Sequence, residues 1–281
     1  MQFTAIAWNL FHGRDFPPDS SLLTWRSRLL RRSERNATHV QVNRGLEAEF
    51  SSLLAGAEWD LALLQEAPPR FMWRLAEASD ADAHRVLTSR NQLGRLRAAA
   101  ARLNPDLIAS GEGGSNLTLL RNRSDHSGGL GGIVERRSLA IHRGRPERRA
   151  MALTRTAGGL CIANLHASSG RPELAAADVL VAAHAASEWA GERPLLFGGD
   201  LNLRPAESPQ TFEELGDRFG LAGPTGAEAI DHLLVRGLAT VSAPAPWSPE
   251  RRELREEDGL ALRLSDHAPV EGRFATTSDR N

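Results

Sequence analysis

The sequence predicts an α/β protein with mixed β-sheets, and three observations support that prediction. Short apolar runs of strand length alternate with helical patterns along all 281 residues. Near the carboxy-terminal end, strand-like runs follow one another with only turns between them, which indicates antiparallel pairs beside parallel ones. The chain is long enough to bury a sizeable core, and nothing along it demands a split, so we expect one domain over residues 1–281.

The first half of the chain is expected to begin with a strand. The run FTAIAW predicts a strand over residues 3–8, and LALL predicts one over 61–64. Between them, apolar residues at helical spacing predict helices over 22–35 and 42–55, with Leu22, Trp25 and Leu29 on one face of the first. Helices at 71–78 and 93–103 and a strand at 116–121 are expected next.

The second half repeats this alternation. Strands are expected at 138–142, 160–165, 194–197, 230–235 and 268–274, and helices at 172–189 and 211–218. The alanine-rich helix at 172–189 begins with proline, which suits a first turn. Residues 121–137, rich in Gly and Ser, and residues 243–258, rich in Pro and charge, are expected to be irregular.

Composition and charge exclude several classes of protein. The formal net charge is −1, so no whole-molecule field attracts polyanions, although local arginine patches remain possible. No stretch approaches the ~20 apolar residues of a membrane helix. The single cysteine, Cys161, excludes an internal disulfide and a cysteine-rich metal site. The amino-terminal residues lack the basic region of a secretory signal, so we expect a soluble, cytoplasmic protein.

Polar side chains stand at the ends of most expected strands. In chain order they are Asn9, Glu66, His166, Asp200, Asn202, Asp231, Asp266 and His267. The packed interior of a strand holds the side chain at its end, which is where functional groups are best placed. Oxygen donors of these types suit hard divalent cations, Mg²⁺ above all. The set therefore indicates a metal-assisted site more than a series of solvated turns.

The stretch LLFGGDLN contains two members of this set. Its apolar strand is expected to end on Gly198 and Gly199, which would let the backbone turn sharply without side chains that crowd a phosphate. Asp200 and Asn202 lie on alternate positions, and in an extended chain that spacing sends both side chains to one face.

Taken in order, the motifs WN, QE, NLH, GGDLN, IDHLL and SDHAPV resemble those of the endonuclease/exonuclease/phosphatase superfamily. Its members include deoxyribonuclease I, class II AP endonucleases, inositol polyphosphate phosphatases and neutral sphingomyelinases. The motifs run from Asn9 to His267. The resemblance implies a deoxyribonuclease I-like, four-layered sandwich of two mixed β-sheets flanked by helices, with the site at one end.

The resemblance also implies a divalent-metal-dependent phosphoesterase that uses Mg²⁺ or Mn²⁺. Glu66 would be the principal carboxylate ligand of the metal, with Asn9 and Asp266 nearby. The motifs do not distinguish one metal ion from two.

The remaining residues would carry the catalysis, an in-line attack of water on a phosphodiester. Asp200, helped by Asn202, would activate or orient the water. His267 would stabilise the charge that grows on the phosphate, and its partner Asp231 would raise the pKa of the imidazole. His166 occupies a position that is His in some relatives and Tyr in others.

Competing functions fit the sequence less well. Ser265, Asp266 and His267 have the residue types of a serine hydrolase triad, but consecutive residues cannot form its geometry. A zinc hydrolase would be expected to show a closely spaced histidine pair, and none is evident. An inactive member that only binds a partner would be marked by a lost ligand, but every expected position is filled.

Five polar residues outside the motifs have two possible interpretations each. His12, Arg14 and Asp15 follow the first strand and either line the substrate cleft or belong to a polar loop. Glu112 and Asn116 precede another strand, where some relatives place an acid that orients a histidine or an amide that faces the phosphate.

Two histidines are expected to be structural. His232 points away from Asp231 if both lie in a strand, which favours a packed core position. His184 lies in the alanine-rich helix.

The leading substrate is DNA, and the expected partner is nucleic acid. One face of the helix at 22–35 carries Arg28, Arg31, Arg32 and Arg35, which either follow a nucleic-acid backbone or only solvate the helix. Further candidates for phosphate contact are the segment 121–137, Arg143, Arg145, Arg148 and Arg149. No apolar, aromatic-tipped membrane loop is evident, so small-molecule or lipid head-group phosphates rank second. We expect a monomer without integral membrane association.

Overall fold

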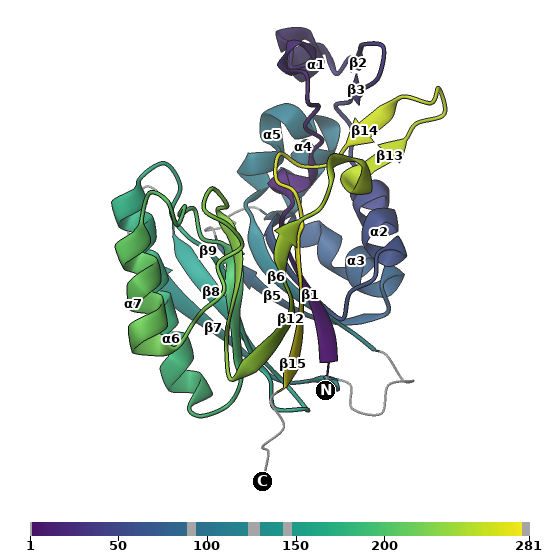
Figure 1. Cartoon of the computed structure of the whole chain (residues 1–281). Coiled ribbons are helices and arrows are strands. Elements are labelled where there is room, and N and C mark those ends of the chain that lie inside the picture. The colour runs from purple at the N-terminus through teal and green to yellow at the C-terminus, as the bar shows by residue number, and fades with distance from the viewer. Residues whose placement is uncertain (1, 89–93, 123–129, 143–147, 277–281) are drawn as a thin grey trace.

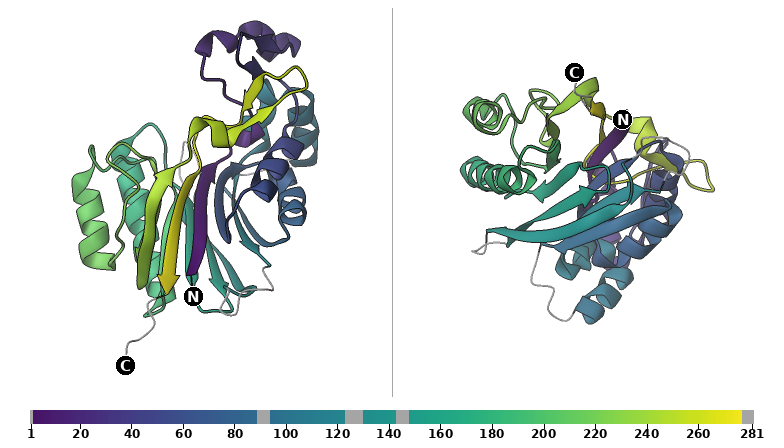
Figure 2. Two further views of the ribbon diagram at one scale, coloured as in Figure 1. Left: turned by 45° about the vertical axis from the view of Figure 1, so that its right-hand side comes forward. Right: turned by 90° about the horizontal axis from the view of Figure 1, so that it is seen from below.

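The computed structural model describes residues 2–88, 94–122, 130–142 and 148–276. Two large mixed β-sheets pack face to face, and helices cover the outer face of each (Figures 1 and 2). The expected α/β class and four-layered architecture are therefore confirmed. Among the described residues, no helix has both the length and the apolar character needed to cross a membrane.

The first sheet has six strands in the order β12-β15-β1-β4-β6-β5. Its strands are β1 (Gln2–Asn9), β4 (Leu61–Ala67), β5 (Ala81–Leu87), β6 (Ser115–Arg121), β12 (Leu238–Pro246) and β15 (Val270–Thr276). β1 and β4 run parallel, and all other neighbours are antiparallel. The carboxyl ends of β1 and β4 therefore share one edge with the start of β15.

The second sheet has five strands in the order β11-β10-β9-β8-β7. Its strands are β7 (Ile133–His142), β8 (Arg149–Thr156), β9 (Cys161–His166), β10 (Leu195–Asp200) and β11 (Asp231–Arg236). β9 and β10 run parallel, so their carboxyl ends lie together, and antiparallel pairing brings the start of β11 beside the end of β10.

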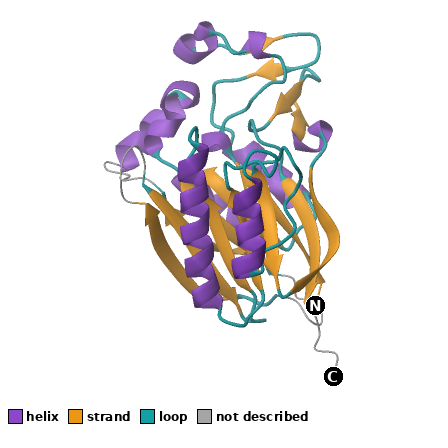
Figure 3. Cartoon of the chain, turned by 60° about the vertical axis from the view of Figure 1, so that its left-hand side comes forward, coloured by secondary structure: helices purple, strands orange, loops and turns teal. Residues whose placement is uncertain are grey.

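Alternation along the strands produces a core between the sheets and a second core under each helical layer. In β1, Ala5 and Ala7 point toward the second sheet, whereas Ile6 and Trp8 point outward to α2 (Glu47–Gly56) and α3 (Met72–Ala78). On the other side, α6 (Pro172–Ala190) and α7 (Pro209–Phe219) lie next to each other over the second sheet (Figure 3). Burying both faces of each sheet leaves the strand ends as the place for polar side chains.

Short elements lie beyond the strand ends of the first sheet, at the top of Figure 1. They are α1 (Trp25–Leu30), β2 (Glu34–Arg35), β3 (Val40–Gln41), α4 (Gly94–Leu103), α5 (Pro105–Glu112), β13 (Glu253–Arg255) and β14 (Ala261–Arg263). Four 3-10 turns complete the described elements: η1 (Phe11–Gly13), η2 (Ser20–Leu22), η3 (Pro69–Phe71) and η4 (Pro249–Arg252).

The predicted helix over 22–35 is wrong in extent and in packing. α1 begins after Thr24, whose hydroxyl accepts a hydrogen bond from the Ser27 amide, and it ends at Arg31, which has a left-handed φ of 54°. Trp25 and Leu29 are 62% and 58% exposed instead of packing inward. The helix is too short to bury an apolar stripe, so it presents that stripe to solvent.

The predicted helix over 42–55 begins later than expected, at Glu47. The Val42 amide donates to Asp15, and the Asn43 side chain donates to the carbonyls of Ser27 and Arg28. These bonds hold the preceding residues in a non-helical conformation.

Other expectations about elements were incomplete. Sequence patterns missed the edge strands β5 and β12, whose apolar signal is weak. They also missed β8, α5 and the short strands β2, β3, β13 and β14. The segment 121–137 contains the start of β7, and 243–258 contains the end of β12, η4 and β13. Residues 123–129, Leu93, Arg143 and Arg145 lie outside the described residues.

Candidate active site

Strand alternation directs the predicted polar residues into one end of the space between the sheets. Four members lie an even number of residues from an inward-facing position of their strand: Asn9 after Ala7, His166 after Ile162, Asp200 after Leu196, and Asp231 before Leu233. Asp200 and Asp231 are directly paired across β10 and β11. The sequence set is therefore brought together in space.

Asn9 links the two sheets. Its Nδ2 donates to Asp200 Oδ2 at 2.9 Å, and its Oδ1 accepts from the Phe11 amide at 2.9 Å. Both ends of the carboxamide are engaged, which fixes its orientation. One lone pair of Oδ1 remains for a cation.

Glu66 reaches the site because its strand departs from regular alternation. A regular strand would turn Glu66 outward with Leu64, but the pairing of β4 with β6 shifts between Leu64 and Ala67, and Glu66 has a φ of 47°. The redirected carboxylate lies 3.2 Å from His12 Nε2 and 3.9 Å from His166 Nε2.

The paired glycines of β10 are required for a different reason from the one expected. β10 continues through them to Asp200. A Cβ on Gly198 would lie 2.4 Å from the His232 carbonyl oxygen, and one on Gly199 would lie 2.1 Å from the Leu165 carbonyl oxygen. Gly199 also has a φ of +123°. Close approach of neighbouring strands requires the glycines, so the expected sharp turn at this point is wrong.

Asn202 is not in the extended conformation that its spacing from Asp200 suggested. Its φ is 52°, and the strand ends at Asp200. The Asn202 amide donates to Asp200 Oδ1 at 3.1 Å, and its Nδ2 donates to the Ala167 carbonyl at 3.2 Å. Asn202 therefore orients Asp200 through its backbone while its side chain ties β9 to the loop.

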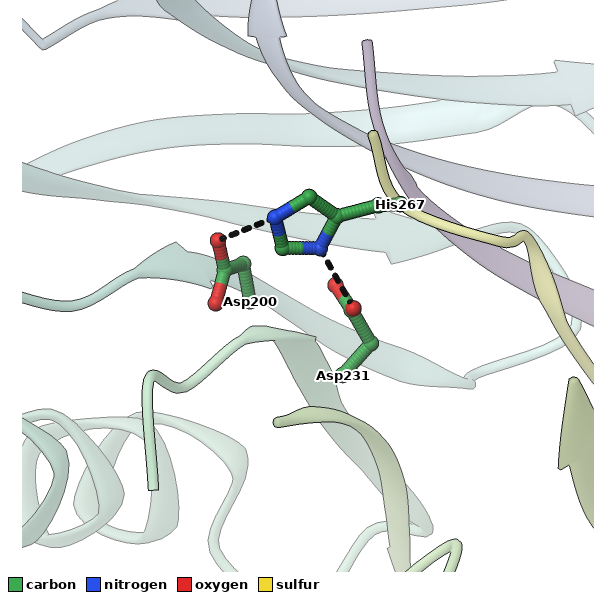
Figure 4. Close-up of side chains that lie close together, drawn as sticks. All are labelled: Asp200, Asp231 and His267. Atoms are coloured by element: carbon green, nitrogen blue, oxygen red, sulfur yellow. Dashed lines mark hydrogen bonds and ion pairs between the residues drawn. The ribbon is translucent and has the colours of Figure 1, made fainter. Parts of the chain in front are cut away.

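His267 lies between two carboxylates of the opposite sheet (Figure 4). Its Nδ1 is 2.7 Å from Asp231 Oδ2, and its Nε2 is 3.9 Å from Asp200 Oδ2. Burial alone would lower the pKa of His267, but the hydrogen bond to Asp231 and the charges of both carboxylates raise it to about 10. The imidazole therefore carries two protons at neutral pH.

Backbone contacts hold His267 in this position. The indole of Trp8 donates to the His267 carbonyl at 3.0 Å. Ser265 accepts from the His267 amide at 3.1 Å and donates to the Asn9 carbonyl at 2.6 Å. From the sequence, Ser265 was considered only as a member of a rejected serine hydrolase triad. Its position in the SDH motif was the available signal that it holds His267 in place.

Burial shifts the pKa values of three further groups. It raises the pKa of Asp200 to about 7, and the adjacent Asp231 carboxylate adds to that rise. It also raises the pKa of Glu66, with Asp266 adding to the effect. It lowers the pKa of His166 well below its ordinary value, and the charge of Arg149 adds to that fall.

Two groups of residues could hold a metal ion. Ligand atoms of Asp200, Asp231 and His267 lie within 4.8 Å of one another. Glu66 and Asp266 form a second pair, and their side chains are 22% and 31% exposed, against 2% for Asp200. Two carboxylates at an open position, one of which raises the pKa of the other, have the donor chemistry that Mg²⁺ and Mn²⁺ prefer.

The secondary candidates differ in their position relative to the site. His12 and Arg14 lie beside the site, whereas Asp15 is buried and accepts from the Val42 amide. Glu112 is buried in an ion pair with Arg70.

The remaining secondary candidates have hydrogen-bond or ion-pair partners outside the site. Asn116 lies between the sheets and donates to the Ala150 carbonyl at 2.8 Å. His232 is a core residue, as expected: its Nε2 donates to the Leu203 carbonyl at 3.0 Å. His184 is exposed on α6 and pairs with Glu188.

Comparison with known proteins supports the expected fold and the family resemblance. The model of the Endonuclease/Exonuclease/phosphatase family matches residues 6–267. No curated protein matches the sequence.

Solved structures with the same fold include three of particular use. An endonuclease/exonuclease/phosphatase from Bacteroides vulgatus is 14% identical, with a TM-score of 0.60 over 99% of this chain and 100% of that one. The mannosyl-6-phosphatase of Bacteroides thetaiotaomicron is 14% identical, with a TM-score of 0.62 over 97% and 99%. Truncated TDP2 of Caenorhabditis elegans is 15% identical, with a TM-score of 0.56 over 98% of each chain. At these identities the likeness concerns the fold alone.

Proposed function

The chain belongs to the Endonuclease/Exonuclease/phosphatase family, and we propose that it hydrolyses phosphodiester bonds of nucleic acid with a divalent metal, by in-line attack of water. Members of this family are hydrolases that act on phosphoesters. The observation that carries the proposal is the pairing of a buried Asp231–His267–Asp200 cluster with two partly exposed carboxylates, Glu66 and Asp266.

Glu66 and Asp266 would hold the metal, with Asn9 Oδ1 as an additional donor. When bound, Mg²⁺ or Mn²⁺ supplies positive charge that neutralises the phosphate and stabilises the leaving oxygen. Asp231 and His267 suit this task less, because Nδ1 of His267 is hydrogen-bonded to Asp231 and the ring is protonated, so it repels a cation.

Asp200 would take the proton of the attacking water. Its pKa of about 7 is near neutral pH, where a general base is most effective. Asn9 and the Asn202 amide donate to its two oxygens, so the carboxylate is fixed in one orientation. His166, 3.4 Å from Asp200 Oδ2, adds a neutral donor beside it.

His267 would donate from Nε2 to a phosphate oxygen. Nδ1 is occupied by Asp231, and Nε2 is 3.9 Å from the nearest Asp200 oxygen, too far for a hydrogen bond. This protonated nitrogen is therefore available to stabilise negative charge that grows on the phosphate.

Nucleic acid is the preferred substrate because positive charge gathers beyond the strand ends. Arg26, Arg28, Arg31 and Arg32 are exposed on or just after α1, together with the exposed indole of Trp25. Arginines contact phosphates, and an exposed indole offers a surface on which a base can stack.

A phosphatase for small or lipid head-group phosphates is the second candidate. One structural neighbour is named as a mannosyl-6-phosphatase. Trp25, Leu29 and Leu30 also form an exposed apolar face on α1, which suits a lipid surface and which sequence patterns did not predict.

A substrate panel tests the proposal. Supercoiled plasmid, abasic duplex, single strands, inositol phosphates, sphingomyelin and nucleotides are assayed with Mg²⁺ or Mn²⁺, with and without EDTA. We expect cleavage of nucleic acid that EDTA abolishes and that Glu66→Gln and His267→Ala both lose. The exposed His184→Ala serves as the control. Turnover of only the other substrates would reverse the ranking, and activity that survives EDTA and both substitutions would refute the mechanism.

A further inference from the structure

Arg14 is a cation held rigidly beside the metal carboxylates. Its guanidinium lies over the ring of Phe11, 3.7 Å from the centroid, and its Nε donates to the Phe11 carbonyl at 3.3 Å. Phe11 in turn packs edge-on against Phe16, with centroids 5.8 Å apart. Stacking and the hydrogen bond together fix the plane of the guanidinium.

The outer nitrogens of Arg14 are available to a ligand. Within the described part of the chain, Nη1 and Nη2 have no hydrogen-bond or ion-pair partner, and neither is among the buried polar atoms. Two adjacent N–H groups on a fixed plane match the oxygens of a phosphate bidentately.

A second arginine, Arg28, lies near Arg14. Arg28 is exposed on α1 and close enough to Arg14 for the two charges to repel. The carbonyl of Arg28 accepts from Asn104 at 2.6 Å and from Asn43 at 3.2 Å, which anchors α1 in this position. Asp106 interacts with both arginines and accepts a hydrogen bond from Gln41. Because it carries a single negative charge, it offsets only one of the two positive charges.

Arg14 and the catalytic histidine lie in different electrostatic surroundings. The charges that act most strongly on Arg14 are those of Asp106, Glu66 and Asp266. Those that act on His267 are Asp231, Asp200 and Asp266. The two residues share Asp266 but differ in their other charged neighbours, and those of Arg14 include Arg28 of α1.

We propose that Arg14, supported by Arg28, binds a second phosphate of the substrate, distinct from the phosphate that is hydrolysed. This inference rests on the proposed phosphoesterase activity. The reacting phosphate already has the metal carboxylates on one side and His267 on the other, so the fixed guanidinium of Arg14 is left for a neighbouring phosphate. That phosphate could be the next one along a nucleic-acid strand or the second group of a small bisphosphate.

The test compares substrates that carry one phosphate with substrates that carry two or more. Bis(p-nitrophenyl) phosphate and a sugar monophosphate are the one-phosphate substrates; a single-stranded oligonucleotide and the matching sugar bisphosphate are the others. For Arg14→Gln we expect KM to rise about 10- to 100-fold on the second group, because a charge-assisted hydrogen bond is lost. We expect less than about a twofold change on the first group.

Three further variants sharpen the comparison. Arg14→Lys should recover part of the loss, since it keeps the charge without the planar fork. Arg28→Gln should shift KM in the same direction by less. Arg74→Gln, exposed on α3, is the matched control. Thermal melting identifies any variant whose KM rises only because the protein is misfolded.

Binding without turnover keeps the test independent of activity. In EDTA, we expect Arg14→Gln to weaken oligonucleotide binding about tenfold and to reduce the slope of log Kd against log salt by about 0.7. Equal losses on one- and two-phosphate substrates would overturn the inference and assign Arg14 to the reacting phosphate. Unchanged KM and salt slope would also overturn it. If no substrate is hydrolysed but the salt slope falls as expected, the proposed function fails while the phosphate site stands.

Discussion

The two sheets contribute unlike halves to one site. The half from the first sheet contains Glu66 and Asp266, which are 22% and 31% exposed, and the charge of Asp266 adds to the raised pKa of Glu66. The half from the second sheet contains His166, Asp200 and Asp231, with side chains between 2% and 8% exposed. Hydrogen bonds from Asn9 and His267 join the halves.

Under the proposed function, this difference would separate the task of binding a cation from that of positioning protons. Buried polar groups must be paired inside the protein, and the second half is paired by its own His166 and Asn202 amide together with Asn9 and His267 of the first half. The open half has fewer internal donors, so its charge is best balanced from outside. A substitution in the buried half should therefore affect chemistry, and one in the open half should affect metal affinity.

The largest expected effect is that of Asp200→Asn in the buried half. We expect kcat/KM to fall about 10³-fold, because the water loses its base. Stability should rise: the pKa of Asp200 is about 7 in the folded protein against 3.8 ordinarily, so its ionisation costs stability as pH rises between those values. Thermal melting at pH 8 should increase by about 2–4 °C. The exposed Asp217→Asn is the control, and activity within tenfold of the unaltered protein would contradict the assignment.

In the open half, Glu66→Gln should act through the metal. We expect the Mg²⁺ concentration for half-maximal activity to rise about 100-fold, because the principal carboxylate ligand loses its charge. Calorimetric titration with Mg²⁺ measures this directly, and stabilisation against heat by Mg²⁺ should disappear. Asp266→Asn should have a smaller effect in the same direction. An unchanged metal affinity with a lower kcat would move Glu66 into the proton-handling half.

The buried half was largely predictable from the sequence. His166, Asp200 and Asp231, together with Asn9 of the first sheet, fall on the inward positions of their strands, and alternation gives these positions once the strands are recognised. Their order along the chain, as a set of motifs, indicated that they meet at one end of a sandwich.

The open half and its surroundings were less predictable because they depend on tertiary contacts. Glu66 is redirected by a break in strand pairing, and Asn202 adopts a left-handed conformation that its spacing does not reveal. The exposure of Trp25 follows from the short length of α1, which is set by distant anchors such as Asn104. The pattern of apolar residues alone indicated a longer, packed helix.

A smaller effect is expected for Asp231→Asn, which tests the link between the halves. Activity should require ionised Asp200 and protonated His267, so the rate should rise with pH through about 7 and fall through about 10. Because Asp231 raises the pKa of both His267 and Asp200, its removal should move the alkaline limb toward the ordinary value of 6.5 and the acid limb to lower pH. A pH–rate profile measures the shift. An unmoved alkaline limb would mean that His267 does not carry the required proton.

The smallest expected effect is that of His12→Asn, beside the open half. His12 Nε2 lies 3.2 Å from Glu66 Oε2, and a φ of 54° at His12 suits asparagine, which tolerates the left-handed region. Asparagine keeps this backbone but is too short to reach Glu66, so the carboxylate loses an orienting donor. We expect metal affinity to fall about tenfold with little change in kcat at saturating metal.

His12→Gln should recover part of the metal affinity, because its longer amide can again donate to Glu66, and His184→Asn is the exposed control. A loss of kcat with unchanged metal affinity would instead mean that His12 contacts the substrate. The division between halves makes these outcomes distinct. A residue that only orients Glu66 changes the metal concentration that activity requires, and it leaves the protonation states of Asp200 and His267 unchanged.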